Sequence, residues 1–197
     1  MRRHVHGVVT FLMGALMVPV FASAAEPLRI DVGSAVDVTI GGKTWKADRY
    51  FTGGSVVDFR NIAIAGTADD RLYQTDRFGM TGYSLPVENG TYQVKLLFAE
   101  TYTGITGRGQ RVFNVNVEGK ALNNVDIFRE AGGRNIALVK TVENVTVNDG
   151  RLNIRFEGVR GTPTIDAIEV LPADVPSNAD MIIDYNPANG AGPLKHV

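Results

Sequence analysis

The stretch that decides the fold reads Thr91-Tyr92-Gln93-Val94-Lys95-Leu96-Leu97-Phe98. Apolar side chains occupy every second position from Tyr92 to Phe98, and the polar Gln93 and Lys95 stand between them. A period of two places the apolar side chains on one face of a strand and the polar ones on the other. The stretch therefore predicts an antiparallel strand with one buried face.

Further strands are predicted on both sides of this stretch. Residues 111–117 and 151–156 alternate in the same way, and shorter candidates cover residues 28–32, 44–47, 62–65, 136–147 and 164–171. Asn89-Gly90 and Asp149-Gly150 favour tight hairpins, because these residue types accept positive φ. One short helical turn is expected, near residues 125–130. The pattern predicts an all-β antiparallel sandwich with little or no helix.

The N-terminal segment is typical of a secretory signal peptide. Arg2 and Arg3 precede a mostly apolar run over residues 8–21, and Ala22-Ser23-Ala24 forms a small-x-small cleavage site before Ala25. The apolar run is short for a membrane span, although an uncleaved anchor is the alternative. We expect a signal peptide over residues 1–24, a sandwich domain over 25–172 and a polar tail or linker over 173–197. The mature protein is expected to be secreted or periplasmic.

The composition excludes several kinds of chemistry. The chain has no Cys, so it has no disulfide, thiolate nucleophile or Cys-ligated metal. Its three His residues are His4, His6 and His196, in the expected signal and tail, which argues against a Ser-His-Asp triad or a zinc site. A net charge of −1 without a basic run argues against nucleic acid as partner. No cofactor is expected, and structural Ca²⁺ is left open without a motif for it.

Two stretches carry the candidate binding residues. Tyr73-Gln74-Thr75-Asp76-Arg77-Phe78 is interpreted as a polar, aromatic-rich loop. Asp76 and Arg77 either contact the ligand or pair with each other or with Glu100 as supports of the loop. Tyr102 follows the 91–98 strand and opens the Gly-rich loop over residues 103–109. Aromatic rings displayed on loops bind the C–H faces of sugars, and carboxylates accept their hydroxyls. The residues therefore favour a carbohydrate site on one rim of the sandwich.

Two other functions remain open from the residues. Asp76 and Glu100 are candidates for the paired carboxylates of a small glycoside hydrolase. A protein-interaction or assembly module at the cell surface is the other alternative, which a large exposed apolar patch away from the rim would favour. Asp166 shares parity with Ile168 and Val170 in its predicted strand. We expect this inward carboxylate to anchor loop backbone, with metal ligation as the second interpretation.

Several blocks of the chain, in order, resemble the malectin family. They read Trp45-Lys46-Ala47-Asp48, Gly53-Gly54, Leu72-Tyr73-Gln74-Thr75-Asp76-Arg77-Phe78, Phe98-Ala99-Glu100-Thr101-Tyr102, Arg111-Val112-Phe113-Asn114-Val115, Val125-Asp126-Ile127-Phe128 and Ile165-Asp166-Ala167-Ile168. The resemblance implies a galactose-binding-like β-sandwich of jelly-roll type. It also implies a non-catalytic module that binds oligosaccharides or polysaccharides, with glucose-rich disaccharides as the known malectin ligands. In bacteria, malectin-like modules often accompany carbohydrate-active enzymes, so such an enzyme or a surface protein is an expected partner.

The resemblance carries over only part of the family's binding site. Tyr102 matches a binding Tyr, Phe78 stands where malectin has a Tyr, and Phe59 matches an earlier binding Tyr. The aromatic residue that follows in malectin is Thr103 here. The family's acid lies in the loop before the last strand, where this chain has Val159-Arg160-Gly161-Thr162. The expected contacts are therefore the rings of Phe59, Phe78 and Tyr102, with Arg160 and either Asp76 or Glu100 for polar groups.

Overall fold

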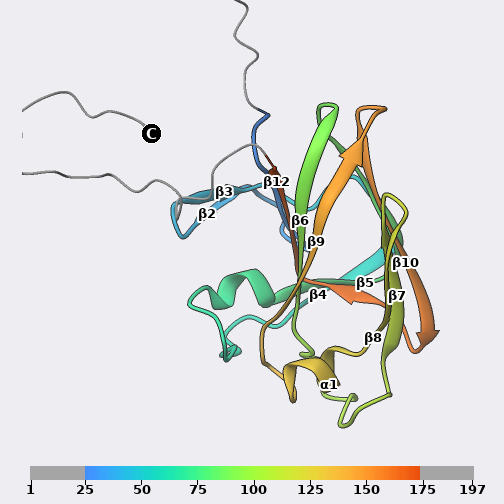
Figure 1. Ribbon diagram of the computed structural model, residues 1–197. Helices are drawn as coiled ribbons and strands as arrows, with labels where there is room; N and C mark the ends of the chain where they lie inside the picture. The colour runs from blue at the N-terminus through green and yellow to red at the C-terminus, as the bar shows by residue number, and fades with distance from the viewer. Residues whose placement is uncertain (1–24, 174–197) are drawn as a thin grey trace, which may run out of the picture.

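The computed structural model describes residues 25–173 and contains two main antiparallel sheets (Figure 1). One sheet has four strands, in the order β1 (Leu28–Asp31), β12 (Ala167–Pro172), β6 (Gly90–Phe98) and β9 (Leu138–Val147). The other has the order β11 (Thr164–Ile165), β5 (Thr75–Pro86), β10 (Arg151–Arg160), β7 (Val112–Val117) and β8 (Lys120–Val125). β10 and β11 pair with one edge of β5, and β4 (Phe51–Asp58) pairs with its other edge. A separate hairpin joins β2 (Val38–Ile40) to β3 (Lys43–Trp45). The helical elements are η1 (Asp70–Tyr73) and α1 (Ile127–Ala131).

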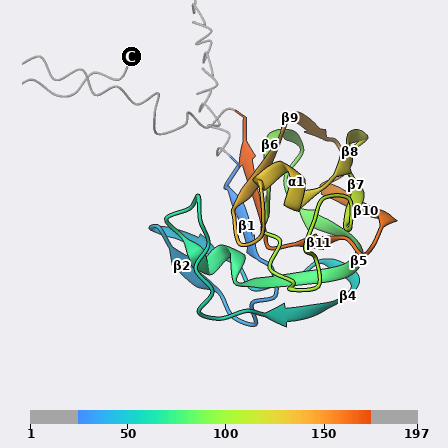
Figure 2. The same cartoon turned by 90° about the horizontal axis from the view of Figure 1, so that it is seen from below.

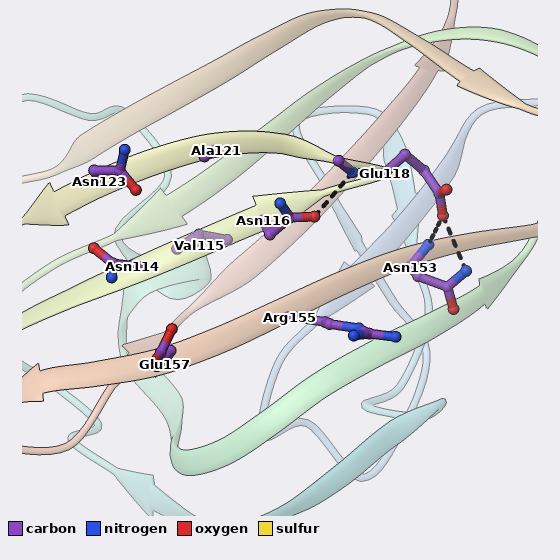
Figure 3. Close-up of a pocket in the computed structure, with 10 residues that line it drawn as sticks. Asn114, Val115, Asn116, Glu118, Ala121, Asn123, Asn153, Arg155 and Glu157 are labelled. Carbon is purple, nitrogen blue, oxygen red and sulfur yellow. Dashed lines mark hydrogen bonds between the residues drawn. The ribbon is translucent and has the colours of Figure 1, made fainter.

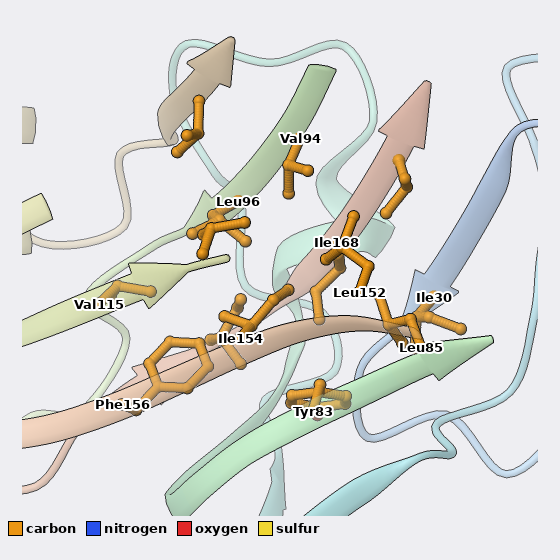
Figure 4. Packing of buried hydrophobic residues seen from close by; sticks show 14 of the residues in the cluster. Ile30, Tyr83, Leu85, Val94, Leu96, Val115, Leu152, Ile154, Phe156 and Ile168 are labelled. Carbon is orange, nitrogen blue, oxygen red and sulfur yellow. The ribbon is translucent and has the colours of Figure 1, made fainter. Parts of the chain in front are cut away.

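The main core lies between the two sheets. Alternate residues of each strand point inward, so that Val94 and Leu96 of β6 face Ile154 and Phe156 of β10 (Figure 4). These side chains are almost fully buried. Burial of this apolar surface is the dominant favourable term in folding, and it fixes the strand register, because a shift by one residue would turn every inward side chain outward.

A second apolar cluster covers the outer face of the four-stranded sheet. Leu97 and Ala167 point away from the main core and pack with Trp45 of β3 and with Leu72 and Tyr73 of η1. The β2–β3 hairpin and η1 therefore close this face. This explains why the C-terminal end of β6 is buried on both sides.

The chain passes from one sheet to the other at Asp166. β11 pairs with β5, whereas β12, which begins one residue later, pairs with β1 and β6. The backbone of Asp166 is held at this crossing, since its N–H donates to Leu97 O at 3.0 Å and its carbonyl accepts from Val32 N at 3.0 Å. Its carboxylate accepts a hydrogen bond from Ala99 N. The expectation that Asp166 anchors loop backbone is confirmed.

Several loops meet at one end of the sandwich. The segment 99–111, which links β6 to β7, and α1 lie together at the lower end in Figure 1, where Gly109 N donates to Asp126 Oδ2 at 2.7 Å. Figure 2 looks at that end and shows β4, β5 and β11 beside this segment. Asp126 also caps α1 by accepting from Arg129 N.

The structure confirms the all-β sandwich and corrects some details. The strands around residues 91–98, 111–117 and 151–156 are present as β6, β7 and β10. Residues 62–65 form no strand and contribute only an isolated bridge from Ala65 to Ile136. Residues 73–78 are not a loop, because η1 ends at Tyr73 and β5 begins at Thr75. The expected signal peptide and most of the expected tail lie outside the described residues.

Candidate functional site

A groove of about 410 Å³ opens at the loop end of the sandwich. Three aromatic side chains line it, and they come from three different segments: Phe59, Phe78 and Tyr102. The remaining lining residues are Val57, Asp76, Ile105, Arg111, Gly161 and Thr162. The structure therefore brings together four of the six residues proposed from the sequence, namely the three rings and Asp76.

Each ring is placed by the backbone of its own segment. Phe59 follows β4, and its N–H donates to Gln74 O at 2.7 Å. Phe78 lies within β5, opposite Ser55 on one side and Thr164 on the other. Tyr102 follows β6 in a turn in which Ile105 N donates to Tyr102 O at 3.1 Å. Phe78 is 36% exposed and Tyr102 is 54% exposed, so both present apolar surface to solvent.

Gly104 permits the position of the Tyr102 ring. A Cβ atom at residue 104 would lie 2.4 Å from Tyr102 Cε1, closer than real Cβ contacts allow. Any larger residue here would displace the ring or the loop. The Gly-rich composition of the 103–109 loop thus has a specific structural use at this position.

The polar part of the groove contains Arg111, whose guanidinium is already held by other groups of the protein. Arg111 Nε lies 2.8 Å from Glu100 Oε2, and Arg111 Nη1 donates to Thr162 O at 2.7 Å. Glu100 is almost fully buried behind this pair and is not a lining residue. Burial raises the pKa of Glu100, and the positive charge of Arg111 opposes this rise. Arg111 therefore joins the Thr162 segment of the rim to the end of β6.

Asp76 is the acid of the groove lining, and it forms no ion pair within the described residues. Burial raises its pKa to about 6; the Arg111 charge lowers it and the Glu100 charge raises it. The hydroxyls of Thr164 and Thr101 lie close enough to lower the pKa as well, although neither reaches hydrogen-bond geometry with the carboxylate. Asp166 lies behind, and burial together with the Asp76 charge raises its pKa well above the usual range.

Arg77 does not pair with Asp76 or Glu100, as one interpretation of the sequence had it. It alternates to the opposite side of β5 and lies 2.8 Å from Asp48 Oδ2. Asp76 forms no ion pair within residues 25–173. The consecutive charged residues Asp76 and Arg77 therefore lie on opposite sides of β5, and Arg77 is the one that forms an ion pair.

Arg160 and Glu100 stand apart from the lining. Arg160 is exposed at the end of β10, next to the lining residues Gly161 and Thr162. The sequence reasoning did not identify Val57, Ile105 or Arg111 as lining residues. Ile105 could have been predicted from the sequence, because it is an isolated apolar residue in a Gly-rich loop and belongs to no alternating strand pattern.

A larger hollow lies on the outer face of the six-stranded sheet. Its volume is about 530 Å³, and it contains the amides of Asn114, Asn116 and Asn153 with Arg155 and Glu157 (Figure 3). Asn153 N and Nδ2 both donate to Glu118 Oε1. No aromatic ring lines this hollow, so it lacks a stacking surface for sugars. The smaller groove is the candidate site. Within residues 25–173, no group of three or more His, Cys, Asp or Glu side chains is arranged to hold a metal ion.

Comparison with known proteins decides the family. The model of the malectin domain matches residues 27–168. The chain belongs to the malectin domain family. Among Arabidopsis thaliana relatives, receptor-like protein 4 is 40% identical over 113 residues, covering 56% of this chain and 18% of its own. The kinesin-like protein KIN-14R is 31% identical over 122 residues, covering 61% and 11%. The chain thus spans less than a fifth of the length of these relatives.

Solved structures show the same malectin-type fold. A β-glucuronidase from Bacteroides uniformis superposes with a TM-score of 0.67 at 25% identity, covering 75% of this chain and 18% of that one. The extracellular domain of ANXUR2 from Arabidopsis thaliana superposes with a TM-score of 0.62 at 21% identity, covering 75% and 49%. The second likeness shows the fold alone. Among residues 25–173, the helices are too short to cross a membrane.

Proposed function

We propose that this malectin domain is an exported, non-catalytic carbohydrate-binding module that recognises oligosaccharides, glucose-rich ones among them. One observation carries the proposal: Phe59, Phe78 and Tyr102 come from separate segments and line one groove with a carboxylate. A mostly apolar groove with a few polar groups is a common form of ligand site. Membership of the malectin domain family supports the same proposal.

The rings would supply faces for stacking, and their exposure has a cost that binding would remove. Phe78 and Tyr102 keep much of their surface in water, and a bound sugar ring would cover it. Asp76 would accept sugar hydroxyls at the floor. Association costs the ligand its translational and rotational freedom, and only the surplus appears as affinity, so we expect weak binding to a single module.

Non-catalytic function is part of the proposal. A pair of catalytic carboxylates would have to reach the substrate, but Glu100 is 1% exposed and lies against Arg111. Asp76 is then left without a partner acid on the groove surface. A region of the same fold within a β-glucuronidase chain fits an accessory role beside a carbohydrate-active enzyme. We extend that role to this chain as a proposed partner.

Calorimetry with a panel of glucose disaccharides and longer gluco-oligosaccharides tests the proposal. We expect at least one ligand to bind, and Tyr102→Ala to weaken it at least tenfold. Tyr50→Ala is the matched control, because Tyr50 is an exposed ring (40%) that does not line the groove. The absence of binding to any glycan on a broad array, with a correctly folded protein, would overturn the proposal.

A further inference from the structure

The floor of the groove holds an acid that the protein leaves unsatisfied. Asp76 is 6% exposed, and its Oδ1 is sealed from solvent without a hydrogen-bond partner. Its Oδ2 is not among the sealed atoms, and Asp76 lines the groove. Buried carboxylates are normally hydrogen-bonded or paired, because an unpaired one is costly to desolvate. Oδ1 is closed to a ligand as well as to solvent, so a group in the groove can reach Asp76 only through Oδ2.

The described groups around Asp76 leave Oδ2 without an ion-pair partner. Arg111 is the cation that faces it, and this guanidinium is engaged by Glu100 and by Thr162 O. Asp166 faces it from the crossing between the sheets and is itself an acid. Thr101 and Thr164 approach, but their hydroxyl oxygens also lack hydrogen-bond partners. With Glu100 balancing Arg111, the groove offers an acceptor but no free cation among its lining residues.

We propose that Asp76 determines the specificity of the groove by accepting hydrogen bonds from sugar hydroxyls, so that the site takes neutral, hydroxyl-bearing sugars and rejects acidic ones. This inference rests on the proposed carbohydrate-binding function. A site built around a buried acceptor rejects a ligand that lacks the matching donor, because the acceptor then stays unpaired.

The protonation of Asp76 gives the site a pH dependence. Because burial raises the pKa of Asp76 to about 6, the carboxylate is mostly charged at pH 7.5 and mostly neutral at pH 5. A neutral carboxyl is a weaker acceptor than a carboxylate. Binding of a neutral sugar should therefore strengthen as pH rises through this range.

Calorimetry on three proteins tests the inference: wild type, Asp76→Asn and Asp149→Asn. Asp149 is the matched control, an exposed Asp that accepts from Arg151 N in a turn outside the groove. The probes are a glucose disaccharide that binds wild type, its monodeoxy analogues and its glucuronic acid counterpart. We expect Asp76→Asn to weaken disaccharide binding about tenfold to hundredfold, the range for a hydrogen bond to a charged group. Asp149→Asn should bind like wild type.

Comparing the loss of affinity caused by Asp76→Asn with the loss caused by removing one sugar hydroxyl distinguishes a direct contact from a structural effect. At least one monodeoxy analogue should bind wild type about tenfold more weakly and show little further loss with Asp76→Asn. The wild-type affinity should rise between pH 5 and 7.5, and that of Asp76→Asn should not. The deoxy series and the pH profile on wild type need no variant, so the test does not depend on the stability of Asp76→Asn.

The inference and the proposed function on which it rests would be rejected by different results. If no glycan binds wild type, the proposed function fails. If a glycan binds but every monodeoxy analogue binds wild type within twofold, or the glucuronic acid counterpart binds more tightly at pH 7.5, the role of Asp76 is overturned while the proposed function stands.

Discussion

Arg77 and Asp48 form a buried ion pair, in which Arg77 Nη2 and Nε each lie 2.8 Å from Asp48 Oδ2. The guanidinium also lies 3.4 Å from the centre of the Phe51 ring and donates to Gly53 O and Gly54 O. Tyr83 Oη donates to the other Asp48 oxygen at 3.1 Å. The pair therefore ties β5 to β4 and to the segment before it, on the side of β5 opposite Asp76.

Removing one partner of this pair should be strongly destabilising. Arg77 is 8% exposed and Asp48 3%, so Arg77→Met would leave a buried, uncompensated carboxylate. We expect a loss of about 3–5 kcal/mol in the free energy of unfolding, measured with urea. Arg60→Met is the control, because its pair with Asp58 is exposed and should contribute about 1 kcal/mol or less. Similar losses for both variants would contradict the structure.

Two aromatic truncations should separate the core from the groove. Phe98 is fully buried and packs 5.8 Å from Phe113 between ring centres, so Phe98→Ala should cost about 3–5 kcal/mol. Tyr102→Ala removes a ring that is 54% exposed and should change stability by about 0.5 kcal/mol or less. Urea unfolding of both variants measures this. A large loss for Tyr102→Ala would mean that the ring is structural.

Asp31 should make stability depend on pH. Its side chain is fully buried, and desolvation raises its pKa to about 6 despite the nearby charge of Arg71. For an acid with a raised pKa in the folded state, the stabilising contribution is complete below the unfolded pKa of about 4 and is lost as pH rises through 6. Asp31→Asn removes this titration. Relative to the variant, wild type should therefore lose stability between pH 4 and pH 6, by at most about 1.4 kcal/mol per pH unit.

Urea unfolding of both proteins at intervals from pH 4 to 7 measures this difference. The comparison cancels the contributions of other acids, such as Asp76, that both proteins share. A difference between the two proteins that stays constant over this range, or that changes in the opposite direction, would show that Asp31 keeps an ordinary pKa in the folded protein.

Asp166 should tolerate an amide better than an apolar side chain. Its carboxyl accepts from Ala99 N at the crossing between the sheets, and its raised pKa favours the neutral form. Asp166→Asn retains an acceptor oxygen, whereas Asp166→Leu leaves the Ala99 N–H unpaired. We expect the Leu variant to be about 1–3 kcal/mol less stable than the Asn variant. Faster hydrogen exchange at the Ala99 amide in the Leu variant is the second measurement; unchanged exchange would refute the anchoring role.

The expected signal peptide gives a prediction from the sequence alone. Expression of the full chain with export machinery should yield a secreted or periplasmic form that begins at Ala25, after Ala22-Ser23-Ala24. Mass spectrometry of the exported protein measures its N-terminus. Recovery of an uncut chain in the membrane fraction would support the alternative of an anchor.

Residues 73–78 show where sequence reasoning failed. Strand prediction depends on apolar residues that recur with a period of two, and β5 begins with the buried charges of Asp76 and Arg77. The polar pattern predicted a loop, because nothing in the chain order shows that Asp48, 29 positions before Arg77, lies beside it in space. The strand β4 was missed for a related reason, since it contains Gly53-Gly54 and is mostly exposed.

The sequence by itself determined the sandwich and the aromatic candidates. Alternation is a local property, so β6, β7 and β10 could be recognised without any knowledge of their neighbours. The rings of Phe59, Phe78 and Tyr102 were found from the loops and from family resemblance, and their binding role stays a prediction. Only the tertiary structure decided that these rings line one groove, that Glu100 is sealed behind Arg111, and that Asp76 faces the groove without a partner. Burial, pairing and solvation depend on residues distant in sequence, and folding alone brings those residues together.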